Sequence, residues 1–121
     1  MPSLFEVTAG SLVGPATGGT VTQATNKATT VISNTESGQI TMNNAALADA
    51  AEVSFTVTNS KVSATDVVVI NHASAGTAGA YVVSVTAVAA GSFKVTVGNV
   101  SGGALSQAIV LNFVALKGAS S

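Results

Sequence analysis

The 121-residue chain contains no cysteine, no tryptophan and no arginine, and only 7% of its residues are charged. Without cysteine it has no disulfide framework, no thiolate zinc site and no thiol nucleophile. Four scattered lysines and five acidic residues give a net charge of −1. This near-neutral chain lacks the basic patch that nucleic-acid-binding proteins need. These absences exclude several classes of function before any motif is considered.

Long apolar runs are also missing. The longest strongly apolar run is Val67–Ile70, whereas a membrane-spanning helix needs roughly 18 residues. Residues 1–4 show neither the basic region nor the apolar region of a secretory signal. We therefore expect no membrane partner and no secretory signal.

Small and β-branched residues dominate, and apolar and polar residues alternate with a period of two. Such alternation is typical of half-buried strands. Turn-forming residues separate eight segments of this kind. The predicted strands are Thr20–Thr25, Ala28–Ser33, Gln39–Met42, Glu52–Thr58, Asp66–His72, Ala80–Val88, Ser92–Gly98 and Ala108–Leu116. Many short, evenly spaced strands predict an all-β fold, a single jelly-roll or Greek-key sandwich.

The pattern divides the chain into an N-terminal arm (1–19), a β-sandwich domain (20–118) and a short tail (119–121). The arm contains both prolines and no clear alternation. Its apolar residues suggest that it packs on protein, either on its own domain or on a partner. These residues are Leu4, Phe5, Val7, Leu12 and Val13.

Two further patterns lie between strands. The alanine-rich segment Asn43–Ala51 begins with asparagines that can cap a helix, which predicts a short helix or helical loop. A unit of strand, asparagine, turn and strand also occurs twice, with its asparagines at Asn59 and Asn99. This weak internal similarity is compatible with two stacked Greek keys.

Three predicted strands, Asp66–His72, Ala80–Val88 and Ala108–Leu116, are apolar on both faces. In Ala80–Val88, one face is expected to hold Ala80, Val82 and Val88. A monomeric antiparallel sandwich normally exposes polar side chains on its outer faces. The surplus predicts a self-association face that consists of Val67, Val69, Val82, Val110 and Val114.

This excess of apolar side chains on the outer faces predicts an obligate homo-oligomer, most simply a closed ring of two or three copies. Burying one valine fully stabilises by about 1.5–3 kcal/mol, so five together favour tight association. The alternative is a monomer kept in solution by serine- and threonine-rich outer faces, with valine present for its β propensity.

Candidate catalytic residues are few. His72 is the only histidine, and it lies six residues from Asp66. Six residues of extended strand separate two side chains by roughly 20 Å, so they form no local dyad. Asp49 and Glu52 lie three apart without a ligand-rich loop around them, and no glycine-rich nucleotide motif occurs. We therefore predict no enzyme activity, no catalytic residues, no metal site and no cofactor.

Three segments carry a resemblance to a known group of proteins: residues 39–43 (QITMN), 65–69 (TDVVV) and 108–113 (AIVLNF). Over residues 18–118 the chain resembles small virion proteins of tailed bacteriophages and prophages. These include capsid decoration (cement) proteins and modules of head and tail fibres. The resemblance implies a β-sandwich, often trimeric, and offers no site residues. It does not extend to residues 1–17.

The resemblance and the residues together predict a capsid decoration protein on the exterior of the virion, made in the cytoplasm of the bacterial host. Its partners would be further copies of itself, as a homotrimer or a dimer, and the major capsid protein. The five apolar arm residues would dock on that capsid protein by strand addition or in a groove.

Two alternatives use other residues. A fibre or spike module would bind a host surface glycan through loops 71–79 or 98–103, although Met1 and the short length favour decoration. A small glycan hydrolase would need Asp49 and Glu52 as its carboxylate pair, and this hypothesis ranks last.

Overall fold

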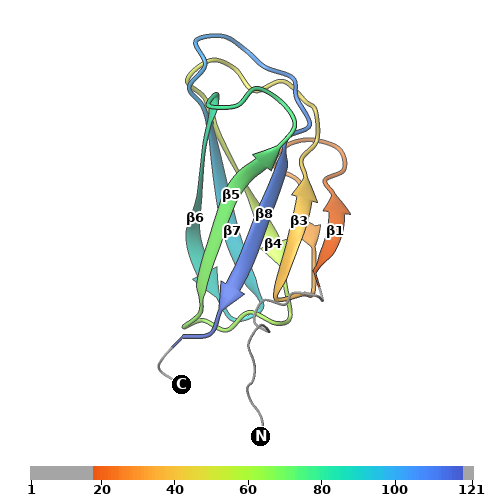
Figure 1. Ribbon diagram of the computed structural model, residues 1–121, viewed down its shortest axis with the longest axis vertical. Helices are drawn as coiled ribbons and strands as arrows, with labels where there is room; N and C mark the ends of the chain where they lie inside the picture. The colour runs from red at the N-terminus through yellow and green to blue at the C-terminus, as the bar shows by residue number, and fades with distance from the viewer. Residues whose placement is uncertain (1–17, 119–121) are drawn as a thin grey trace, which may run out of the picture.

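Residues 18–118, which the computed structural model describes, form an all-β sandwich of two four-stranded sheets, as the sequence predicts (Figure 1). Each of the eight predicted segments overlaps one strand. The first sheet consists, in spatial order, of β1 (Gly19–Thr22), β3 (Ser37–Thr41), β8 (Val110–Leu116) and β5 (Val67–Ser74). The second consists of β2 (Val31–Ile32), β4 (Glu52–Thr58), β7 (Ser92–Asn99) and β6 (Tyr81–Ala89).

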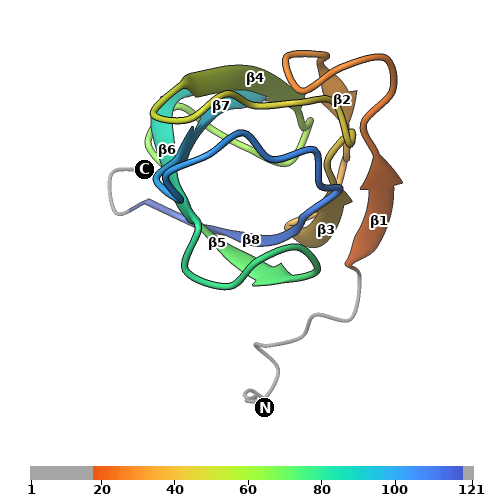
Figure 2. The same ribbon diagram turned by 90° about the horizontal axis from the view of Figure 1, so that it is seen from above.

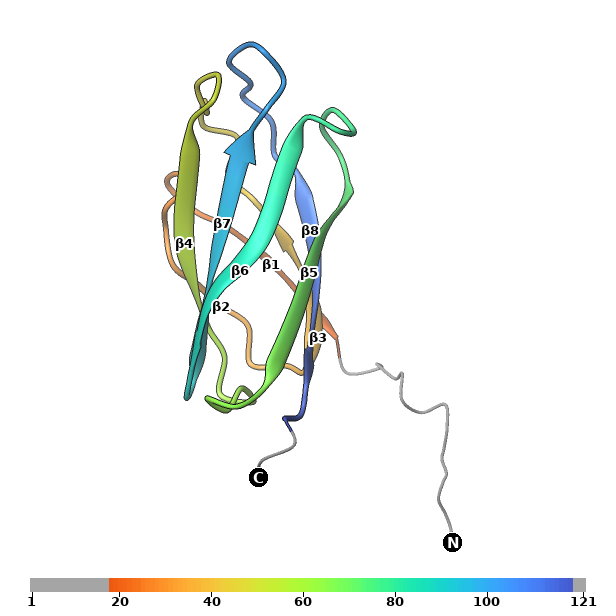
Figure 3. The ribbon, with the colours of Figure 1, turned by 90° about the vertical axis from the view of Figure 1, so that its left-hand side faces the viewer.

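The connections wind around the sandwich. Only the β6–β7 hairpin stays within one sheet, and every other connection between the eight strands crosses to the opposite sheet (Figure 2). Connections that cross between the two sheets are common in β-sandwiches. The short strands β1 and β2 pair in parallel with β3 and β4, whereas the other pairs are antiparallel. β5 and β6 are the edge strands opposite β1 and β2 in their sheets, and they lie side by side (Figure 3).

The core lies between the two sheets and is built from the inward positions of the alternating pattern. Its central contact joins the sheets, because the rings of Phe93 (β7) and Phe113 (β8) lie 5.3 Å apart, centroid to centroid. Residues that are at most 2% exposed include Ile40, Met42, Phe55, Val57, Phe93, Val95, Val97, Ile109 and Leu111. The period-two pattern therefore selects the buried face of β3, β4, β7 and β8 correctly.

The two asparagines of the repeated sequence unit have the same role in the structure. Asn59 is 0% exposed and Asn99 is 1% exposed. Each side-chain oxygen accepts a hydrogen bond, 2.9 Å long, from the backbone N–H two residues later. Each side-chain amide donates to a distant carbonyl, from Asn59 to Thr35 and from Asn99 to Leu47 and Gly103. Both asparagines thus close a strand end by satisfying buried backbone groups.

The predicted helix at 43–51 is wrong, because this segment contains no helix in the structure. The side chain of Asn43 accepts a hydrogen bond from the backbone N–H of Ala45, which forms an Asx turn instead of a helix cap. Leu47 exchanges both backbone hydrogen bonds with Leu105. The backbone groups that a helix would have used are therefore bonded to Leu105. This tertiary pairing overrides the helix propensity of the alanines.

The predicted faces of β6 are wrong at both ends. Ala80, just before the strand, is 3% exposed, and Val88 packs against the core, whereas Val82 points outward and is 58% exposed. The pairing of β6 with β7 shifts between Val85 and Ala87. A bulge inserts one extra residue and exchanges the two faces beyond it.

Replacing Asn99 should test the role of the buried asparagines. In Asn99→Ala, the N–H of Ser101 loses its partner and the carbonyls of Leu47 and Gly103 each lose one of two hydrogen bonds. We therefore expect the free energy of unfolding to fall by about 1–3 kcal/mol. Urea denaturation measures this loss. Asn112→Ala, on an exposed position of β8, is the matched control and should change stability little. An equal loss in both variants would contradict the assignment.

Candidate interaction surface

The outer face of the first sheet carries a group of apolar side chains near the end at which the described chain begins and ends (Figure 1). Val69 lies opposite Val114, and Val67 lies opposite Leu116, on neighbouring strands β5 and β8. Val67, Val69 and Leu116 are 56%, 49% and 51% exposed, and Val114 is half-buried. We call these four residues the apolar patch.

The next rows of the same face are polar but uncharged. Register places Thr20, Gln39, Asn112 and Asn71 side by side across all four strands. The row beyond contains the half-buried Val110. None of the residues in β1, β3, β5 and β8 is lysine, arginine, aspartate or glutamate. The face therefore lacks the charges that usually keep small domains apart.

Four of the five predicted association residues share this face, namely Val67, Val69, Val110 and Val114. Leu116, which the sequence places on the same side of its strand, completes the patch. Val82 does not belong to it, because β6 lies in the other sheet.

The outer face of the second sheet has a different character. Hydroxyl groups form a row in which Thr96 contacts both Ser54 at 2.8 Å and Thr86 at 3.0 Å. Val82 lies at one end of this sheet, in a hollow that it shares with Val100. The two outer faces thus differ, and only the first carries a cluster of exposed apolar strand residues on adjacent strands.

The five predicted arm residues, Leu4, Phe5, Val7, Leu12 and Val13, lie outside the described residues.

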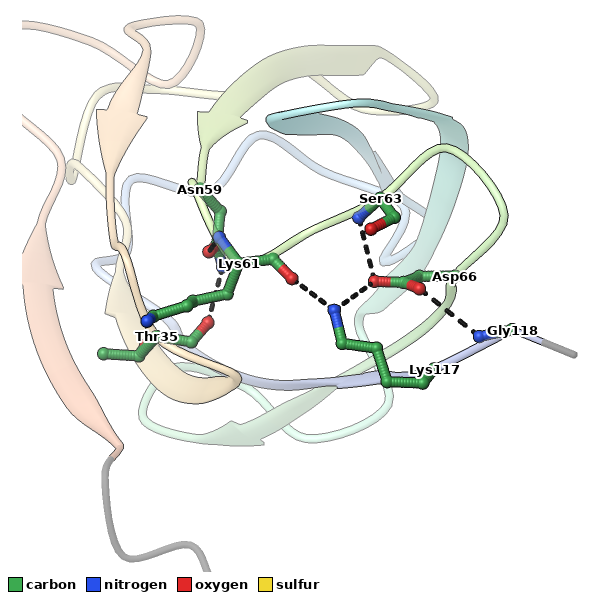
Figure 4. A network of polar contacts seen from close by, with 7 residues as sticks. All are labelled: Thr35, Asn59, Lys61, Ser63, Asp66, Lys117 and Gly118. Carbon is green, nitrogen blue, oxygen red and sulfur yellow. Dashed lines mark hydrogen bonds and ion pairs between the residues drawn. The ribbon is translucent and has the colours of Figure 1, made fainter. Parts of the chain in front are cut away.

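A polar network fixes the end of the sandwich beside the apolar patch (Figure 4). One carboxylate oxygen of Asp66 accepts hydrogen bonds from the backbone N–H of Ser63 at 2.9 Å and from Nζ of Lys117 at 3.0 Å. The other accepts from the N–H of Gly118 at 3.3 Å. The bond from Ser63, followed by that from Lys117, lowers the pKa of Asp66. The network joins the start of β5 to the end of β8, the two strands that carry the patch.

The opposite end contains the candidate groups for chemistry. Nε2 of His72 lies 3.0 Å from the carbonyl oxygen of Ser74 and 2.6 Å from that of Ala75. Tyr81 packs edge-on against the His72 ring at 5.5 Å, and burial raises the pKa of Tyr81. Because the carboxylate of Asp66 is bound to Lys117 at the far end of β5, His72 and Asp66 form no dyad, as predicted.

Buried Lys27 was not singled out from the sequence. It is 3% exposed, and its Nζ donates to the carbonyls of Asn43 and, at 2.7 Å, of Gln107. Burial lowers the pKa of Lys27. Gln23, 1% exposed, donates to the carbonyl of Lys27 and accepts from the N–H of Asn43. This cluster satisfies backbone groups of three loops, so its role is structural.

Other classes of site find little support in residues 18–118. Asp49 and Glu52 are exposed, and no group of three or more histidine, aspartate or glutamate side chains in this range is placed to hold a metal ion. No helix able to cross a membrane is found in the same range. Comparison with protein-family models, with curated proteins and with solved structures finds no match.

Lowering the pH should reveal how much Asp66 contributes to the stability of the fold. Its folded pKa lies below the ordinary value of 3.8, so its ionised form stabilises the fold above that value, and this contribution disappears as the pH falls through the folded pKa. We therefore expect the urea midpoint of the wild type to fall on acidification from about pH 5 to about pH 2. The midpoint of Asp66→Asn should start lower and fall less.

The exposed Asp49→Asn is the control for the loss of one carboxylate. It should follow the wild-type curve. A wild-type curve as flat as that of Asp66→Asn would show that the ionised carboxylate of Asp66, with its bonds from Ser63 and Lys117, does not stabilise the fold.

Proposed function

We propose that this chain is a structural subunit of a phage virion, and most simply a capsid decoration protein. The observation that carries the proposal is the uncharged outer face of the first sheet with its apolar patch. A decoration protein acts by binding other protein subunits, so it needs an exposed interaction surface and no catalytic group. The likeness of residues 18–118 to small virion proteins of tailed phages supports the same assignment.

The patch supports self-association as the first step of assembly. Val67 and Leu116 are each more than half exposed and lie opposite one another. Full burial of each would stabilise by about 1.5–3 kcal/mol. In the proposed homotrimer these side chains contact neighbouring copies, and the polar row of Asn71 and Asn112 supplies hydrogen-bonding groups at the rim.

Capsid attachment is assigned to the N-terminal arm. Its apolar residues, from Leu4 to Val13, would add a strand to the major capsid protein or lie in a groove on it. The contact between each copy and the capsid can be weak, because a trimer on a symmetric site of the capsid exterior gains avidity.

A glycan-binding fibre module is the second candidate. One observation favours it: the loop between β5 and β6 borders a hollow lined by His72, Ser74, Gly76 and Tyr81. Tyr81 is only 8% exposed, and its hydroxyl donates to Gln107, so the hollow offers no open aromatic platform for a sugar. Capsid decoration therefore ranks first.

A charge placed in the patch should disrupt the oligomer. We expect the wild type to be a trimer by light scattering at micromolar concentration, and Val67→Asp to dissociate at least tenfold more readily, because a buried carboxylate without a partner is costly. Thr58→Asp, on the outer face of the second sheet, should stay trimeric. A wild-type monomer would overturn self-association.

Capsid binding tests the proposed function itself. The wild type should co-sediment with the heads of the phage that encodes it, and a variant without residues 1–17 should bind at least tenfold more weakly while retaining its strand content by circular dichroism. Unchanged binding of the shortened variant would remove the arm from the docking surface. Binding to a glycan array and not to heads would favour the fibre module.

A further inference from the structure

We infer that two copies of this chain pack the outer faces of their second sheets together about a two-fold axis, so that Lys94 of each copy enters a hollow beside Glu52 of the other. This inference goes beyond the proposed function, because it concerns the other outer face and a second contact between copies.

The hollow lies at one end of the outer face, across the adjacent strands β4, β7 and β6 (Figure 3). Its lining includes Glu52, Gly98, Val82 and Val100. The two valines are 58% and 59% exposed, so the hollow has apolar walls that solvent reaches. Gly98, itself buried, forms the floor, because it pairs with Glu52 on one side and with Val82 on the other.

The fold does not require glycine at position 98. Gly98 is not among the described glycines with positive φ, and it lies within β7, where glycine costs stability. A Cβ there would be 3.5 Å from Cγ of Glu52, which is an ordinary contact. Glycine inside a strand often marks a place that another molecule approaches closely. Here it leaves the space between the side chains of Glu52 and Val82 open.

The same face carries two opposite charges without an ionic partner. Glu52 and Lys94 are exposed, and no other residue of β2, β4, β6 or β7 is charged. The one ion pair within residues 18–118 joins Asp66 and Lys117. Lys94 lies four residues along β7 from Gly98, the residue opposite Glu52, or about 13 Å away. Glu52 and Lys94 are therefore too far apart to pair within one copy.

The register places these two charges symmetrically about one row of the sheet. Lys94 and Gly98 lie two residues on either side of Thr96 in β7. Glu52 pairs with Gly98, and Ser54 pairs with Thr96. A two-fold axis that runs across the strands above this middle row exchanges its two sides. It places Lys94 of each copy opposite Gly98 of the other, which is the reciprocity that an isologous contact requires.

The contact joins groups of matching chemistry. Two sheets that pack face to face lie about 10 Å apart, so a long side chain reaches from one sheet into a hollow of the other. The aliphatic stem of Lys94 packs against Val82 of the second copy, and its ammonium group meets the carboxylate of Glu52. Ser54 and Thr96 in the middle row are small, and their hydroxyl groups already bond to each other at 2.8 Å.

A second copy is the occupant because one surface supplies both the hollow with its carboxylate and the lysine that fits it, at equal distances from one axis. Each ion pair then forms twice. Thr58 lies four residues from Ser54 along β4, about 13 Å from the axis, and so outside the paired rows. The apolar patch lies on the opposite face and stays free for its own partner.

Charge reversal tests this contact in the full-length protein. Val67→Asp serves as the parent, because it weakens association through the apolar patch, and sedimentation velocity at micromolar concentration should show it as a dimer. Glu52→Lys or Lys94→Glu, added alone, brings like charges together in both contacts, so each variant should associate at least tenfold more weakly. In an equimolar mixture of these two variants both contacts join opposite charges, and association should return to that of the parent.

Glu36→Lys and Lys61→Glu are the matched controls. They change the net charge by the same amounts at exposed positions outside the strands of this face. Each control, and their mixture, should associate like the parent. The comparison separates a specific contact from a general effect of net charge.

Three outcomes would overturn the inference: a monomeric parent, equal behaviour of test and control variants, or a mixture of Glu52→Lys and Lys94→Glu that stays dissociated. If the parent were monomeric and Glu52→Lys weakened its binding to phage heads, the hollow would belong to a lysine of the capsid protein. The wild type, with Val67 in place, reports the proposed trimer separately, so its failure is distinguished from a failure of this inference.

Discussion

A β-strand places every second side chain on the side away from the core, so a sandwich is defined as much by its two outer faces as by its interior. In this protein the inner positions are filled by the Phe93–Phe113 contact and the valines around it. On the outer side of the first sheet, charge is absent and Val67, Val69 and Leu116 stay exposed. The proposed function follows from this asymmetry between the two outer faces.

Buried polar residues form hydrogen bonds with the connecting segments at the two ends of the sandwich. Asn59, Asn99 and Gln23 each use a side-chain amide to satisfy carbonyl groups of connecting segments, and Lys27 does so with its ammonium group. Asp66 and Lys117 tie the strands of the apolar patch together. In residues 18–118 the hydrogen-bonding groups of these side chains are therefore used to stabilise the fold. The interaction surface is left as its most distinctive feature.

The eight strands could be predicted because alternation is a local property, and the excess of valine marked three strands with apolar residues on both faces. What could not be predicted depends on distant partners. Leu105 takes the backbone groups of Leu47 and prevents the expected helix, and the bulge after Val85 exchanges the faces of β6. Periodicity identifies the outer face of a strand but not the sheet to which the strand belongs, so it does not separate Val82 from Val67. Lys27 resembles any surface lysine in the sequence, and only its carbonyl partners explain its burial.

We propose that other protein, most simply another copy of this chain, covers the apolar patch in the native state. The reactivity of a thiol at Val69→Cys in the folded, full-length protein, compared with a thiol at Thr58→Cys, tests it most directly. Because Thr58 is an exposed position of the opposite sheet, its thiol should react with a maleimide at the rate of a free one. We expect the thiol at position 69 to be labelled at least tenfold more slowly. Equal rates at the two positions would contradict it.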